Sequence, residues 1–169
     1  MVKVVMDSTC GMTVEEFEQA GITMVPLYIR EGDRLYRDGI DIKPADFYRK
    51  EREGVIFESA QTNPDDLVRT FKPILDAGDE IVCVMISSAI SGSVNAAHVA
   101  AQMLGAEDRV SVVDSRQSGY GQLEIGRMAK RMADEGKNRT EIVDAVTDLR
   151  ERTWVFTKVS NRVHNLCAV

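Results

Sequence analysis

One segment, the apolar run at residues 81–86, constrains the fold of this chain more than any other. Its sequence, IVCVMI, contains no polar residue, and four of its six residues are β-branched. A strand with one buried face alternates apolar and polar residues, whereas a strand covered on both faces is apolar throughout. We therefore expect residues 81–86 to form a central strand of a parallel sheet, with helices packed on both sides of it.

The rest of the chain alternates between short apolar segments and helical patterns. Four more segments are predicted strands: residues 2–6, 22–29, 109–115 and 154–159. Capping signals and apolar spacing predict helices near residues 13–20, 46–53, 63–75, 97–104, 125–132 and 142–149. Pro26 should mark an edge or a bulge of its strand, and Pro73 should kink its helix. This order of elements predicts the α/β class, with a mostly parallel sheet flanked by helices.

Charge and composition exclude several kinds of partner. The net charge is −6, and no basic stretch could neutralise phosphates, so we expect no nucleic-acid partner. The chain has neither a signal-like start nor an apolar run of about eighteen residues, which predicts no membrane insertion and a cytoplasmic location. Three cysteines without CxxC spacing fit a reducing compartment better than a disulfide framework.

Hydroxyl residues follow three of the predicted strands. Asp7 and Ser8 follow the first, a serine-rich stretch at residues 87–93 follows the central strand, and Ser115 follows the next. The carboxyl ends of parallel strands meet at one edge of a sheet, where hydroxyls and helix N-termini can hold a carboxylate or a phosphate. A single serine there is more often a helix cap. The stretch at 87–93 exceeds what capping needs, and its candidate site residues are Ser87, Ser88, Ser91, Gly92 and Ser93.

Other chemistries have less support in the sequence. The stretch lacks the lysine of a phosphate-binding loop, and no GxGxxG or GxSxG pattern is present. His98 falls within a predicted helix, where a surface or packing role is expected. We therefore predict no catalytic set, no metal and no cofactor. Two alternatives to a binding protein stay open: an enzyme that handles phosphate at the serine-rich site, and a remnant that binds nothing.

Six motifs, taken together and in order, resemble those of the DegV family of bacterial fatty-acid-binding proteins. They are VVMDST, VPLYIREGDRLYRDGIDI, DFY, SAQTNPDD, ISSAISGSVNAAHVAA and VVDSRQSGYGQ. The resemblance implies a two-domain carrier, not an enzyme, that encloses one long-chain fatty acid. Some members present this fatty acid to a separate fatty acid kinase. The resemblance therefore implies a bound long-chain fatty acid as the ligand and no cofactor.

The resemblance also implies where the fatty acid carboxylate is held. It places one hydroxyl at Ser59 and another at Ser87 or Ser88. The backbone around Ser91, Gly92 and Ser93 completes this site. The loop that begins at Ser59 departs from the family pattern, because Ala60 stands where a second hydroxyl is usual.

The resemblance covers residues 1–157, which we expect to form an amino-terminal α/β domain. Residues 158–169 are predicted to be an atypical tail where the second domain of the family would begin, so most of that domain would be missing. Each buried methylene contributes about 0.8 kcal/mol to the free energy of binding. A fatty acid tail that the protein covers on only one side loses much of this contribution. We therefore expect weak fatty acid binding by this chain alone, and an exposed apolar groove that either drives self-association or is covered by a partner.

Overall fold

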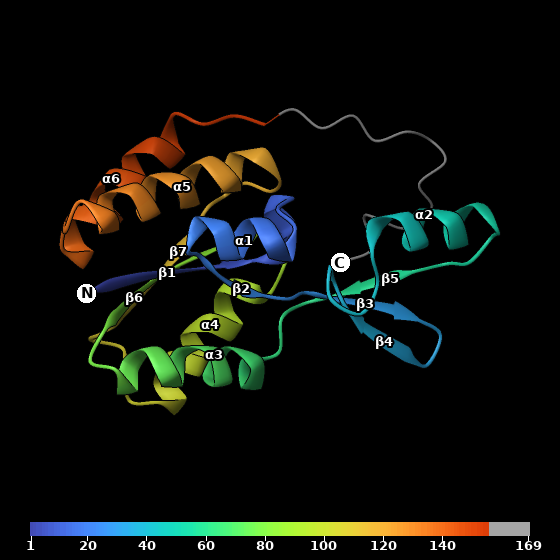
Figure 1. Cartoon of the computed structure of the whole chain (residues 1–169), viewed down its shortest axis with the longest axis horizontal. Helices are drawn as coiled ribbons and strands as arrows, with labels where there is room; N and C mark the ends of the chain where they lie inside the picture. Colours follow the sequence, from blue (N-terminus) through green and yellow to red (C-terminus); the bar gives the residue numbers. More distant parts are fainter. Residues whose placement is uncertain (156–169) are drawn as a thin grey trace.

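A four-stranded parallel sheet forms the centre of the computed structural model, which describes residues 1–155 (Figure 1). The strands are β1 (Val2–Asp7), β2 (Thr23–Val25), β6 (Glu80–Met85) and β7 (Val110–Asp114), in the order β2-β1-β6-β7. Residues 81–85 of the apolar run lie in β6, which pairs with β1 on one side and with β7 on the other. The predicted central strand and the α/β class are confirmed.

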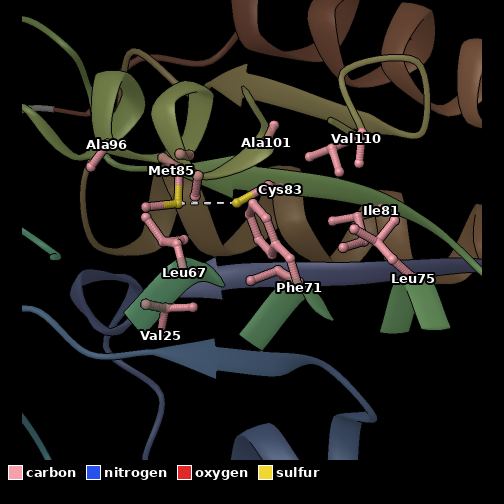
Figure 2. Packing of buried hydrophobic residues seen from close by; sticks show 14 residues of the cluster. Val25, Leu67, Phe71, Leu75, Ile81, Cys83, Met85, Ala96, Ala101 and Val110 are labelled. Carbon is pink, nitrogen blue, oxygen red and sulfur yellow. Dashed lines mark hydrogen bonds between the residues drawn. The ribbon is translucent and has the colours of Figure 1, made fainter. Parts of the chain in front are cut away.

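Helices cover both faces of this sheet (Figure 1). Alternate residues of β6 face the two layers. Cys83 and Met85 pack with Phe71 (Figure 2), whereas Val84 packs with Ile125 on the opposite face. The first layer comprises α3 (Pro64–Asp76) and α4 (Ser93–Met103), and the second comprises α1 (Val14–Ala20), α5 (Tyr120–Asp134) and α6 (Arg139–Glu151). Burial on both faces explains why the run at residues 81–86 has no polar residue.

A second, smaller sheet extends from the side of the parallel sheet (Figure 1). It contains β3 (Tyr28–Glu31), β4 (Arg34–Arg37) and β5 (Glu58–Ala60), which are antiparallel in the order β4-β3-β5, together with α2 (Pro44–Arg52). We call residues 28–60 the small lobe and residues 1–25 and 64–155 the parallel lobe. Only two short connectors, residues 26–27 and 61–63, join the lobes along the chain.

The structure corrects the prediction of one strand over residues 22–29. That segment is split into β2 and β3, which belong to different sheets. The break falls at Pro26, which has no N–H to donate to a ladder. The sequence suggested an edge position, and β2 is indeed the edge strand of the parallel sheet.

The six predicted helices correspond to α1–α6, whereas β4 and β5 of the small sheet were not predicted as strands. α3 continues through Pro73 to Asp76. The predicted strand at residues 154–159 is not formed where it can be checked, because Trp154 and Val155 lie in no strand, and its remaining residues lie outside the described part of the chain. The predicted boundary at residue 157 also lies outside it and stays a prediction. None of the helices in residues 1–155 is both long and apolar enough to span a bilayer.

Candidate functional site

The sheet order brings the polar strand ends together. β1, β6 and β7 are neighbours and run parallel, so the residues that follow them meet at the carboxyl edge of the sheet. Asp7, the loop that begins at Ser87 and Asp114 are the first polar groups there. We call residues 87–93 the serine loop.

Asp7 lies beneath this edge and is fully buried. One carboxylate oxygen accepts the N–H of Ile86, at 2.6 Å, and the other accepts from the backbone and hydroxyl of Thr9 and from Nε2 of Gln122. Burial raises the pKa of Asp7 above its ordinary value, and these hydrogen bonds act in the opposite direction. The Ile86 bond fixes the peptide that leads into the serine loop. The structure therefore gives Asp7 a supporting position rather than a surface from which to touch a ligand.

Ser8 connects the two lobes. Its hydroxyl donates to Oδ2 of Asp38 at 2.7 Å and accepts the N–H of Leu27 at 3.1 Å. Ser8 is itself buried. Both partners belong to the small lobe or its first connector, so the Ser8 hydroxyl, like Asp7, is engaged inside the protein.

Ser87 and Ser88, which the sequence could not separate, differ in their surroundings. Ser87 is buried, and its Oγ accepts the N–H of Ala89 at 3.3 Å. Ser88 is exposed, and its hydroxyl and N–H both donate to the carboxylate of Asp114, at 2.5 and 3.2 Å. Burial acts to raise the pKa of Asp114, but the hydrogen bonds from Ser88 and the Arg116 N–H outweigh it, and the pKa lies below its ordinary value.

The end of the serine loop begins α4 without a side-chain cap. Gly92 is the N-cap residue and has no side chain to accept from the first turn, although Ser91 Oγ accepts the N–H of Ser93 at 3.3 Å. The hydroxyls of Ser91 and Ser93 are 2.9 Å apart, and Ser93 Oγ accepts the N–H of Thr62 at 3.4 Å. Ser93 is buried, whereas Ser91 is half-buried. If the Ser93 hydroxyl donates to Ser91 Oγ, the hydroxyl proton of Ser91 is free to point away from Ser93.

The small lobe approaches the serine loop through the connector that follows β5. Ser59 is exposed in β5, where it pairs with Ile29 of β3. Two residues later, the side-chain amide of Gln61 lies directly over Gly92: a Cβ atom on Gly92 would be 1.8 Å from Gln61 Oε1. Ser59 is a predicted site residue, whereas the sequence pattern did not single out Gln61. A glycine between two serines was the only sign of this close approach.

A pocket of about 200 Å³ opens in the small lobe. It is lined by Ile29, Asp38, Ile42, Lys43, Pro44, Phe47 and Tyr48. Its volume is below the roughly 300–1,000 Å³ usual for a ligand pocket.

Exposed apolar side chains occur at the carboxyl edge of the parallel sheet, in its loops and at the start of α5, namely Ile90, Tyr120, Trp154 and Val155. Self-association through such a surface stays a prediction.

The candidate chemistry of the site is that of anion binding by neutral groups. Across residues 1–155, no three His, Cys, Asp or Glu side chains are placed to hold a metal ion together. His98 is exposed on α4, as expected, and Cys10 and Cys83 are buried free thiols. Beside the carboxylates of Asp7 and Asp114, this edge carries serine hydroxyls and the start of α4, and both of these favour negatively charged ligands.

Comparison with known proteins gives a consistent result. Residues 1–166 match the family model described as uncharacterised proteins of the DegV family. A DegV domain-containing protein of Caldanaerobacter subterraneus is 32% identical over 145 residues, which are 86% of this chain and 51% of that protein. A DegV domain-containing protein of Deinococcus radiodurans is 31% identical and is matched over 62% of its length by 99% of this chain.

Solved structures share the fold. A DegV family protein from Thermus thermophilus, described for its fatty acid binding, matches with a TM-score of 0.80 and 30% identity over 89% of this chain and 53% of its own. A stearic acid-binding protein from Eubacterium ventriosum matches with a TM-score of 0.78 and 27% identity over 87% and 52%. The chain spans about half the length of these relatives. With a family match over nearly all of its residues and a shared fold, this chain belongs to the DegV family.

Proposed function

We propose that this chain binds the carboxylate of a long-chain fatty acid at the carboxyl edge of the parallel sheet, as a carrier. The observation that carries the proposal is the start of α4. Its N-cap residue, Gly92, provides no side-chain cap, the hydroxyls of Ser91 and Ser93 lie at its first turn, and the connector that follows β5 reaches it through Thr62. A helix start whose N-cap residue has no side chain offers N–H donors and the positive end of the helix dipole, which suit a carboxylate.

The candidate residues divide into contacts and supports. Ser59 and Ser91 have exposed or half-buried hydroxyls, and we assign them to the head group. Ser88 can join them if its hydroxyl leaves Asp114. Ser87 and Ser93 shape the serine loop, while the backbone at Gly92 approaches the ligand. Asp7 and Ser8 hold the loop and the small lobe in place.

The relatives support the choice of ligand. Solved family members from Thermus thermophilus and Eubacterium ventriosum are described as binding a fatty acid. By analogy, the bound acid would be presented to a fatty acid kinase, and the chemistry would belong to that partner. Since this chain spans about half of each relative and its small-lobe pocket is only about 200 Å³, we expect it to bind a sixteen-carbon acid more weakly alone than a full-length carrier does.

The first test is native mass spectrometry of the purified chain, followed by extraction of any bound lipid and titration with hexadecanoate. Ser59→Ala and Ser91→Ala should each weaken binding by about tenfold, the effect of one hydrogen bond to a charged group. Thr140→Ala, an exposed change at the start of α6, is the matched control and should leave binding unchanged. Absence of hexadecanoate binding, or turnover of ATP by the chain, would contradict the carrier proposal.

A further inference from the structure

The side chain of Gln61 occupies an unusual position between the two lobes. It extends from the connector after β5 and lies against Gly92, at the centre of the sequence Ser91-Gly92-Ser93. A Cβ atom at position 92 would be 1.8 Å from Gln61 Oε1, 2.8 Å from its Cδ and 3.3 Å from its Nε2. Any side chain at position 92 would therefore occupy the space that the Gln61 amide now fills.

The backbone does not explain this glycine. Gly92 has φ −78° and ψ 3°, which residues with side chains adopt readily. Nine other glycines of the described chain have positive φ, where glycine is favoured for conformational reasons, and Gly92 is not one of them. A Cβ atom at this position would instead meet the Gln61 amide.

The hydrogen bonds around Gly92 leave the amide available. They join Ser91, Ser93 and the Thr62 N–H to one another, and none of them involves Gln61. Gln61 itself is exposed to solvent. A side-chain amide carries two N–H donors, which can bind a carboxylate oxygen without adding charge.

We propose that Gln61 is a ligand-contacting residue that donates Nε2–H to the fatty acid carboxylate, and that Gly92 admits it to this position. The inference rests on the proposed function and deepens it, because it makes the connector of the small lobe a determinant of carboxylate recognition. Gln61 would then favour ionised acids over neutral lipids with the same tail.

The first experiment changes the charge of this group at nearly constant shape. Gln61→Glu replaces the donor with an acceptor that repels a carboxylate, and Gln61→Met removes the donor and keeps the length. Tetradecanoate and tetradecan-1-ol are titrated at about pH 8, where the acid is ionised. Gln61→Glu should weaken tetradecanoate binding by at least about tenfold and change tetradecanol binding by less than about threefold. Gln61→Met should weaken tetradecanoate binding by less than Gln61→Glu does.

The second experiment tests the role of Gly92. Because the atoms in the way are the flexible end of a side chain, Gly92→Ala should displace the amide and leave the unfolding midpoint almost unchanged. It should weaken tetradecanoate binding as much as Gln61→Met does. In the double variant the two effects should coincide instead of adding, because either change alone already removes the contact.

The outcomes separate this inference from the function on which it rests. If the unaltered chain binds no tetradecanoate, both proposals fail. If it binds, but Gln61→Glu affects acid and alcohol equally, Gln61 has only a packing role and this inference alone is overturned. Additive losses in the Gly92→Ala and Gln61→Met double variant would show that Gly92 acts independently of the amide, which contradicts the second half of the proposal.

Discussion

The two lobes are stabilised in different ways. The parallel lobe buries apolar side chains on both faces of its sheet, in two clusters that include Phe71 and Ile125. Within residues 28–60 only Tyr36 and Ile42 are buried apolar side chains. The small lobe depends instead on partly exposed contacts, such as the stacked rings of Phe47 and Phe57, with centroids 4.5 Å apart.

This difference determines how the candidate site can behave. The serine loop belongs to the well-packed lobe, whereas Ser59 belongs to the lobe with few buried contacts. Segments with few buried apolar contacts open at a lower free energy than core strands do. We infer that the parallel lobe presents one fixed half of the site and that the small lobe supplies an adjustable half.

The largest expected effect compares one aromatic residue from each lobe. Phe71→Ala should lower the free energy of unfolding by about 3–5 kcal/mol, because it leaves a cavity in a fully buried core. Phe47→Ala should cost only about 1–2 kcal/mol, since Phe47 is half-buried and water can fill its place. Urea unfolding of both variants measures the difference. Equal losses would contradict the comparison between the lobes.

A smaller but specific effect is expected from Asp7→Asn in the parallel lobe. The two carboxylate oxygens accept from N–H groups on opposite sides, so either orientation of an asparagine amide turns a donor toward another donor. One unsatisfied buried hydrogen-bonding group should lower the free energy of unfolding by about 1–3 kcal/mol at neutral pH. Urea unfolding gives the loss, with Ser115→Ala, another buried polar change at the same edge, as the control.

The pH dependence of this variant has a definite sign. The pKa of Asp7 is raised above its ordinary value of 3.8 in the folded protein. The folded state therefore binds a proton before the unfolded state does, and the wild type gains stability as the pH falls toward 3.8. Asp7→Asn lacks this group, so its deficit relative to the wild type should grow on acidification. A deficit that shrinks would show that the hydrogen bonds outweigh burial.

The contrast between the lobes also explains how far the sequence alone could lead. The parallel lobe was predictable because burial on both faces leaves a continuous apolar run, as at residues 81–86, and because helix starts such as Thr13 carry capping signals. The small lobe was not, since the break at Pro26 assigns one apolar segment to two sheets. The sequence likewise located the serine loop. It could not reveal that Ser8 is hydrogen-bonded to Asp38, that Ser93 is hydrogen-bonded to Thr62, or that Gln61 lies on Gly92, because each of these contacts joins residues far apart in the chain.

Ser8→Ala tests the connection between the lobes. It removes the hydroxyl that holds Asp38 and leaves the N–H of Leu27 without its acceptor, which should cost about 1–2 kcal/mol. The loss should fall mainly on the small lobe. Hydrogen exchange should accelerate for amides of β3 and β5 while those of β1 and β6 keep their protection. Ser115→Ala, whose hydroxyl bonds only within the parallel lobe, is the matched control. Uniform acceleration across both lobes would contradict a local connection.

The smallest effect is expected from the ion pair between Glu31 and Lys50, whose side chains approach to 2.5 Å at the surface of the small lobe. Hydrogen bonds from Lys50 and Tyr36 lower the pKa of Glu31 below its ordinary value of 4.5. Its contribution to stability is therefore fully present above pH 4.5 and is lost as the pH falls below that value, the opposite of Asp7. Glu31→Gln should speed exchange slightly in β3 and β4 at about pH 6.5, and less so in acid or high salt, because acid neutralises Glu31 and salt screens a half-buried pair at the protein surface. If the increase in exchange caused by Glu31→Gln became larger in acid, the surface ion pair would not be what stabilises the small lobe. The proposed difference between the two halves of the site would then depend on the aromatic contacts of the small lobe alone.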